Sequence, residues 1–174
     1  MNSKSFLMSK SLLIIVGLFI ILFTSACSSP KLPPMPDIGA QVDEFNTDFK
    51  LSVPEGWNTY KVNEPVILRI EVLGNESISF SYDAFNNRKD INLFVLEENK
   101  WVEIENLAKY PEGFLVYMPA NTDPLKYGVV SIFPILKDID QTVLLRIVLT
   151  GYFFENNQIT NKQSISYIDV PLNP

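Results

Sequence analysis

Residues 66–72 read Val-Ile-Leu-Arg-Ile-Glu-Val, and this stretch decides the fold class. Apolar side chains occupy every second position from Val66 to Val72, with Arg69 and Glu71 between them. Successive side chains of a β-strand point to opposite faces. The stretch therefore predicts a strand with one face in a core and the other toward solvent.

The same period of two recurs in residues 77–82 and 143–150, and turn-forming pairs such as Gly74-Asn75 and Glu98-Asn99 separate the repeats. We expect strands near 47–53, 66–73, 77–82, 91–97, 100–105, 114–118, 127–134, 142–154 and 162–170. The one stretch that suggests a short turn of helix is 104–110. Many short strands with frequent turns predict an all-β, antiparallel β-sandwich.

Two segments carry a resemblance to a known fold. Residues 60–72, Tyr-Lys-Val-Asn-Glu-Pro-Val-Ile-Leu-Arg-Ile-Glu-Val, followed by Gly74-Asn-Glu-Ser77, resemble the early strand of immunoglobulin-like domains in bacterial surface proteins. Residues 143–151 and 163–170 resemble the closing hairpin of that fold. The resemblance extends to the intracellular proteinase-inhibitor-like family and implies an immunoglobulin-like sandwich, with proteinase inhibition as one possible activity. The cysteine pair of antibody domains is absent, since the chain has one Cys.

The N-terminus reads as an export signal. Lys4 and Lys10 precede an apolar run from Leu12 to Phe23. As a helix this run spans roughly 18 Å, which is short of the roughly 30 Å hydrocarbon core of a bilayer. A basic start followed by a short apolar run predicts a signal peptide over residues 1–26.

Cys27 makes the predicted type of export signal more specific. Residues 23–27, Phe-Thr-Ser-Ala-Cys, resemble the lipobox of bacterial lipoproteins, which implies cleavage before Cys27 and acylation (palmitate) of its thiol. Thr24 departs from the usual Leu. The expected location is the cell membrane or outer membrane, lipid-anchored and facing away from the cytoplasm. The alternatives are a signal peptide followed by an unrelated cysteine, and an uncleaved anchor helix.

The next segment predicts a spacer. Residues 27–46 contain Pro30, Pro33, Pro34 and Pro36, which favour extended chain over helix. We therefore expect three parts, which are a signal peptide (1–26), a lipidated Cys27 with an exposed Pro-rich linker (27–46), and a sandwich domain (47–174).

Composition excludes several classes of function. The absence of His excludes Ser-His-Asp and Cys-His catalysis and imidazole ligation of metals, and a single Cys excludes a cysteine-built zinc site. The net charge of −6 argues against nucleic acid as a partner. We predict a protein that is not an enzyme and has no cofactor.

Two acidic groups offer alternatives. Glu97, Glu98, Glu103 and Glu105 flank one predicted hairpin, and two carboxylates suffice for a carbohydrate-active enzyme. The competing interpretation is a charged edge strand. Asp123, Asp138 and Asp140 carry oxygen ligands for Ca²⁺ but lack the spacing of a calcium loop, so we predict no metal site.

Aromatic residues supply the candidate binding surface. Trp57 lies in the predicted turn Pro54-Glu-Gly-Trp57, and Tyr152, Phe153 and Phe154 follow one another in a predicted strand. Exposed aromatic side chains are frequent in binding surfaces, whereas buried ones are ordinary sandwich core. The sequence thus predicts a membrane-tethered, non-catalytic binding or assembly module for an envelope protein or polysaccharide.

Overall fold

The computed structural model describes residues 31–40, 42–57, 59–81, 90–105, 115–118, 127–137, 139–156 and 158–174. The chain divides into two compact units, Met1–Pro34 and Met35–Pro174. Of the first unit, residues 31–34 are described, and they have no regular secondary structure. The fold below is that of the second unit.

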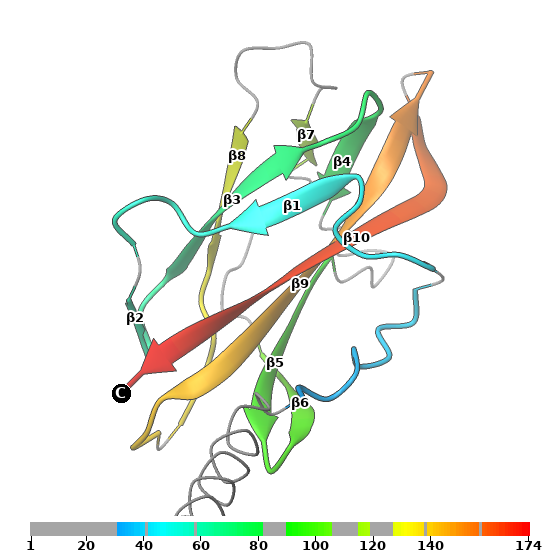
Figure 1. Ribbon diagram of the computed structural model, residues 1–174. Coiled ribbons are helices and arrows are strands. Elements are labelled where there is room, and N and C mark those ends of the chain that lie inside the picture. The colour runs from blue at the N-terminus through cyan, green and yellow to red at the C-terminus, as the bar shows by residue number, and fades with distance from the viewer. Residues whose placement is uncertain are drawn as a thin grey trace, which may run out of the picture. The chain divides into compact units, whose positions relative to one another are not determined.

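The described residues of the second unit form strands and no helix (Figure 1). The strands are β1 (Phe49–Ser52), β2 (Tyr60–Lys61), β3 (Val66–Val72), β4 (Ser77–Ser81), β5 (Ile91–Glu97), β6 (Lys100–Ile104), β7 (Leu115–Met118), β8 (Tyr127–Ile132), β9 (Val143–Glu155) and β10 (Gln158–Asn173). All nine expected strands are present, β10 is longer than expected, and β2 was not expected. The short helix near 104–110 falls mainly outside the described residues.

The strands form two sheets. The smaller has the order β1-β3-β8, all antiparallel. The larger, which we call the large sheet, has the order β2-β10-β9-β4-β7, with β5 paired to β9 and β6 paired to β5. The pairing of β2 with β10 is parallel, and the others are antiparallel.

β9 organises the large sheet. One of its edges pairs with β10, and its other edge is divided between two strands. β4 pairs with residues 152–154 of β9, and β5 pairs with residues 145–149. A bond from the Thr150 N–H to the Asp90 carbonyl, 2.7 Å long, joins the two stretches. β4 and β5 therefore follow one another along a single edge of β9.

The core lies between the two sheets. β3 contributes Val66, Leu68, Ile70 and Val72, all buried, while the residues between them are half-buried, as the alternation predicts. The large sheet contributes alternate residues of β9 and β10, including Leu145, Ile147, Phe153, Val170 and Leu172. This packing of two all-β layers confirms a β-sandwich.

Gly151 allows the sheets to approach closely. A Cβ at this position would lie 2.4 Å from Cγ2 of Ile78 and 2.8 Å from Cε1 of Phe80. The ring of Phe80 in turn packs edge-on against Phe49 of the small sheet, with ring centroids 5.0 Å apart. The missing side chain of Gly151 thus makes room for an aromatic contact across the core.

The second face of the large sheet is buried as well, which differs from the expectation of a solvent-facing side. Phe94, Val148 and Ile165 on this outer face are at most 5% exposed. Met35, Ile38, Ala40, Val42 and Phe45 pack against them. We call residues 35–46 the strap.

The strap corrects the expected spacer. Residues 35–46 belong to the folded unit and are not an exposed linker, because apolar side chains spaced along this segment pack against the apolar outer face of the large sheet. The compact unit accordingly begins at Met35 and not at Thr47. Figure 1 shows the strap, in blue to cyan, running along the large sheet from the β5–β6 hairpin toward β1.

Candidate functional site

Trp57 is presented by a tight turn between β1 and β2. The Trp57 N–H donates to the Pro54 carbonyl at 3.2 Å, and Gly56 has a φ of 84°. This is the third position of a type II turn, where a positive φ favours glycine. The turn holds the indole at the surface, where Trp57 is 47% exposed.

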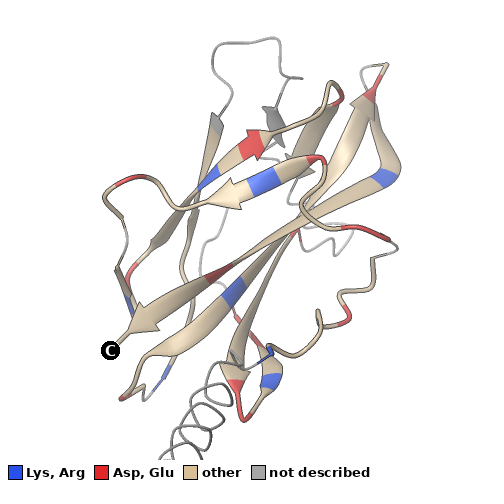
Figure 2. Cartoon of the chain, viewed as in Figure 1, with Lys and Arg blue, Asp and Glu red and all other residues tan. Residues whose placement is uncertain are grey.

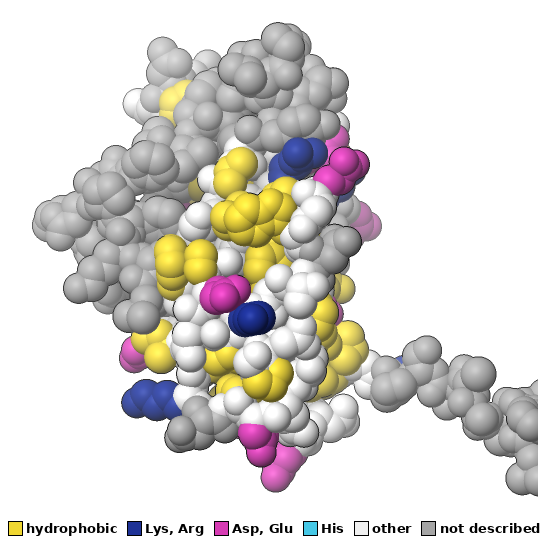
Figure 3. All heavy atoms as spheres, turned by 90° about the vertical axis from the view of Figure 1, so that its left-hand side faces the viewer, with side chains coloured by type: hydrophobic (Ala, Val, Ile, Leu, Met, Phe, Trp, Pro, Cys, Tyr) yellow, Lys and Arg dark blue, Asp and Glu magenta, His cyan; other side chains and the backbone are white. Residues whose placement is uncertain are grey.

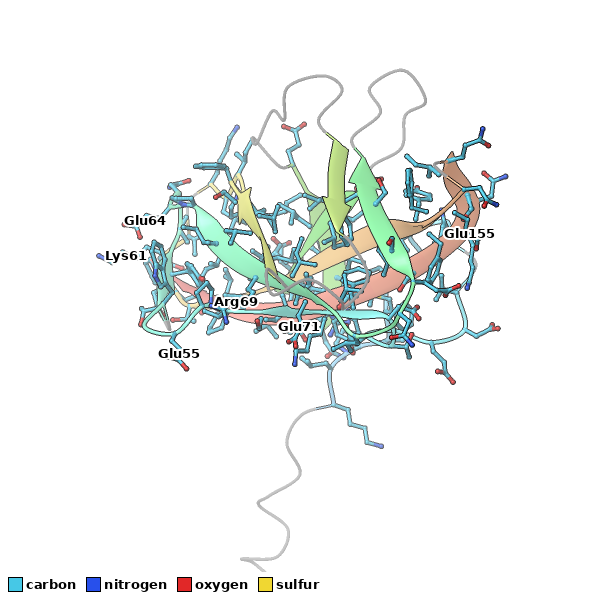
Figure 4. The ribbon with its side chains drawn as sticks, turned by 90° about the horizontal axis from the view of Figure 1, so that it is seen from above. Glu55, Lys61, Glu64, Arg69, Glu71 and Glu155 are labelled. Carbon is cyan, nitrogen blue, oxygen red and sulfur yellow. The ribbon has the colours of Figure 1, made fainter. Side chains whose placement is uncertain are left out.

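Charged side chains border this turn. Lys61 and Glu64 enclose a second tight turn, closed by a 3.2 Å bond from the Glu64 N–H to the Lys61 carbonyl. Figure 4 shows Glu55, Lys61 and Glu64 at one end of the sandwich and Glu155 at the other. All of these residues are exposed. This surface therefore combines a large aromatic face with positively and negatively charged side chains, a combination that suits binding. These residues do not form the nucleophile–base pair that covalent catalysis needs.

The three consecutive aromatic residues do not form a surface. Tyr152 is 5% exposed and Phe153 is 2% exposed, whereas Phe154 is half-buried. Phe153 points into the core between the sheets. Because Tyr152 and Phe153 are buried, we assign them structural roles, and Trp57 is the one exposed residue among the four candidates.

The outer face of the large sheet contains a buried ion pair that the sequence did not reveal. Arg146 of β9 lies directly opposite Asp169 of β10. Its Nε donates to Oδ1 and its Nη2 to Oδ2, both at 2.7 Å. The side chain of Arg146 is 5% exposed and that of Asp169 is 21% exposed. Two parallel bonds from a guanidinium to a carboxylate form a strong, oriented pair.

Two aromatic rings flank this guanidinium. Its carbon lies 4.0 Å from the ring centre of Trp101 on β6 and 4.6 Å from that of Tyr167 on β10. Rings at this distance attract a cation. The alternation around Arg146 indicates a strand, but neither its partner nor its burial follows from sequence, since both depend on the register of β9 with β10. The arrangement neutralises a buried charge with groups from three strands, so we assign it a structural role.

The acidic groups remain dispersed. Glu97, Glu98, Glu103 and Glu105 are all exposed around the β5–β6 hairpin, where Figure 2 shows acidic residues near the tip. β6 pairs with β5 alone among the described strands, as an edge strand does. Asp140 is exposed, while Asp123 and Asp138 lie outside the described residues. Within the described ranges, no group of three His, Cys, Asp or Glu residues is placed to hold a metal ion.

Other exposed apolar side chains are scattered. Figure 3 shows hydrophobic side chains between charged ones on the side of the molecule that is at the left in Figure 1. Among the residues that the structure describes, the large exposed hydrophobic ones are Leu32, Trp57, Leu73, Val102, Val129 and Phe133. Single exposed hydrophobic residues are normal in folded proteins. Trp57 and Phe133 are the aromatic members of this set, and Trp57 is the larger and, at 47% against 41%, the more exposed.

Comparison of this chain with protein-family models, with curated proteins and with solved structures found no match. Cys27 and the apolar run before it lie outside the described residues. In the part of the chain that the structure does describe, there is no helix of the length and hydrophobicity needed to span a membrane.

Proposed function

We propose that this protein is a lipid-anchored, non-catalytic binding module of the cell envelope, built on an immunoglobulin-like sandwich. The observation that carries the proposal is Trp57, 47% exposed on a turn fixed by a hydrogen bond and a glycine. Trp is enriched among residues that dominate binding energy, and a turn that fixes the backbone beneath an exposed indole reduces the conformational entropy lost on binding.

The strand order supports the immunoglobulin-like part of the proposal. The consecutive pairings β10-β9-β4/β5 correspond to strands G, F and C of that fold, and β1-β3-β8 correspond to A, B and E. In this correspondence β6 and β7 take the place of the strand after C. The turn bearing Trp57 lies between β1 and β2, and Glu55 of this turn is at the end of the sandwich opposite Glu155 of the β9–β10 turn (Figure 4). In this correspondence the Trp57 surface therefore lies at the end away from the F–G loop.

The N-terminal sequence supports the anchor. A basic start, a short apolar run and a small residue before Cys27 together favour cleavage and acylation at that cysteine. Two acyl chains hold a protein stably on a membrane, since each buried CH₂ contributes about 0.8 kcal/mol. Mass spectrometry of protein extracted from membranes tests this directly. An acylated N-terminal Cys27 is expected, and an intact Met1 or an unmodified Cys27 thiol would contradict the anchor.

Site-directed crosslinking in intact cells tests the binding surface. A photoreactive residue at Glu55, beside Trp57, is expected to capture an envelope protein or polysaccharide. Replacing Trp57 by Ala should reduce that capture by roughly 30-fold, which is the effect of losing about 2 kcal/mol at a residue that dominates binding. Leu73 is the matched control position for the photoreactive residue. It is 41% exposed, and it lies just after the C-terminal end of β3, whereas Glu55 lies between β1 and β2. Equal capture from both positions, or no effect of Trp57→Ala, would refute this surface.

A further inference from the structure

The strap is fastened at one end. Phe45 forms a parallel bridge with Ile165 of β10, and the Asn46 N–H donates to the Ile165 carbonyl at 2.9 Å. The side-chain Oδ1 of Asn46 accepts from the Tyr167 N–H at 2.9 Å and from the Ser166 hydroxyl. Three hydrogen bonds to consecutive residues of β10 thus converge on Asn46.

The rest of the strap is held mainly by side-chain contact. Met35, Ile38, Ala40 and Val42 are only half-buried. The backbone turn within it is local, closed by a 2.8 Å bond from the Gly39 N–H to the Asp37 carboxylate. A segment with few sheet hydrogen bonds and partial burial opens at a lower free energy than the core beneath it.

The charged groups on the sheet face under the strap have their partners within the sheet and not in the strap. Arg146 donates its hydrogen bonds to Asp169 on β10, and its guanidinium contacts the rings of Trp101 on β6 and Tyr167 on β10. Removing the strap therefore leaves no unpaired buried charge, which would otherwise make opening very costly. What opening exposes is the apolar group around Val148.

We propose that the strap is a detachable segment that opens without unfolding the sandwich, with Asn46 as its latch. This inference rests on the proposed function in one respect, because the strap lies between the lipidated Cys27 and the sandwich. An extended chain spans about 3.3 Å per residue, so release of residues 35–46 lengthens the reach of the tether by up to roughly 40 Å. The latch thus sets how far from the membrane the Trp57 surface can bind.

Thiol labelling tests the opening in the full chain carrying Cys27→Ser, which removes the chain's single native thiol. Val148→Cys places a thiol under the strap, where Val148 is 0% exposed. Ile147→Cys is the matched control one residue away, because Ile147 is 1% exposed but points into the core. We expect the Val148→Cys variant to react at least roughly 100-fold faster, since local opening is cheaper than global unfolding.

A second pair of variants isolates the latch. Asn46→Gly removes the side-chain acceptor while glycine accommodates the φ of 61°, and Asn63→Gly makes the same change at an exposed residue with a φ of 65°. Loss of two hydrogen bonds should speed labelling of the Val148→Cys variant roughly tenfold. Labelling of the Ile147→Cys variant should not change, and Asn63→Gly should have no effect on either.

Equal labelling rates at the two thiols would overturn the proposal, because the strap would then open only when the sandwich unfolds. No effect of Asn46→Gly would overturn the role of the latch. If the Val148→Cys variant does not fold, Ile165→Cys, on β10 under the same strap and 1% exposed, serves in its place. The background lacks Cys27, so the labelling result is independent of the mass spectrometry that tests the anchor.

Discussion

Replacing Asp169 by Asn is the sharpest test of how the large sheet is stabilised. The substitution keeps the shape of the side chain but leaves the Arg146 guanidinium, 5% exposed, without its counter-charge. Breaking a buried pair by removing one partner costs about 3–5 kcal/mol. Water can reach Asp169, which is 21% exposed, and the rings of Trp101 and Tyr167 remain. We therefore expect the lower end of that range, about 3 kcal/mol.

Urea unfolding of the full chain in detergent measures this cost without adding salt. With a slope of about 1–3 kcal/mol per molar urea, a loss of 3 kcal/mol lowers the midpoint by about 1–3 M. The exposed pair between Lys162 Nζ and Glu76, at 3.0 Å with both side chains more than half exposed, supplies the control. Glu76→Gln should cost less than about 1 kcal/mol.

The double variant Arg146→Met, Asp169→Leu tests whether the cost comes from an uncompensated charge. Its loss of stability should be about 2 kcal/mol smaller than the sum of the losses in Arg146→Met and in Asp169→Leu. Each of these single variants leaves one charged group buried without its partner. If Asp169→Asn costs no more than Glu76→Gln, or if the single effects simply add, the reasoning about the buried pair is wrong.

Two further predictions concern the core and the alkaline limit of stability. Gly151→Ala should destabilise the fold by about 1–3 kcal/mol in urea unfolding, because its Cβ would lie 2.4 Å from Ile78 Cγ2. The control Gly74→Ala, with its nearest atom at 3.9 Å, should change stability by less than about 0.5 kcal/mol. Burial raises the pKa of Tyr60 above its usual value of 10.0, and the neutral hydroxyl donates a 2.7 Å hydrogen bond to the Ile67 carbonyl. The folded state therefore retains the Tyr60 proton at pH values where the unfolded chain loses it, so this stabilisation is complete below pH 10 and is lost as the pH rises through the raised pKa. Tyr60→Phe should flatten the fall in stability between neutral and alkaline pH, and an unchanged fall would contradict this assignment.

The sequence predicted the strands well because their signal is local. Alternation in residues 66–72 and 143–150 reflects the pleat of one strand, and left-handed turn residues such as Asn99, with a φ of 62°, break it at defined points. β2 was not predicted, because a strand of two residues is too short to show an alternation of apolar and polar side chains. Its parallel pairing depends on the end of β10, far along the chain.

The candidate surface was predicted less well. Trp57 was identified from a turn that is defined by neighbouring residues, Pro54 and Gly56, and the structure places it at the surface. Tyr152 and Phe153 were misassigned because burial on both faces of β9 depends on what covers the sheet. On the outer face around Val148 that cover includes the strap, which the prolines of residues 27–46 suggested to be part of an exposed linker.

The sequence by itself therefore determined the all-β class, the positions of most strands and the chemistry that an absence of His excludes, and it predicted an export signal. Only the tertiary structure decided that Arg146 pairs with Asp169, that Gly151 makes room for Phe80, and that residues 35–46 cover a sheet. The physical reason is the separation along the chain of the residues that interact. Strands and turns arise from a few adjacent residues, whereas strand register and sheet cover bring together side chains that lie many residues apart.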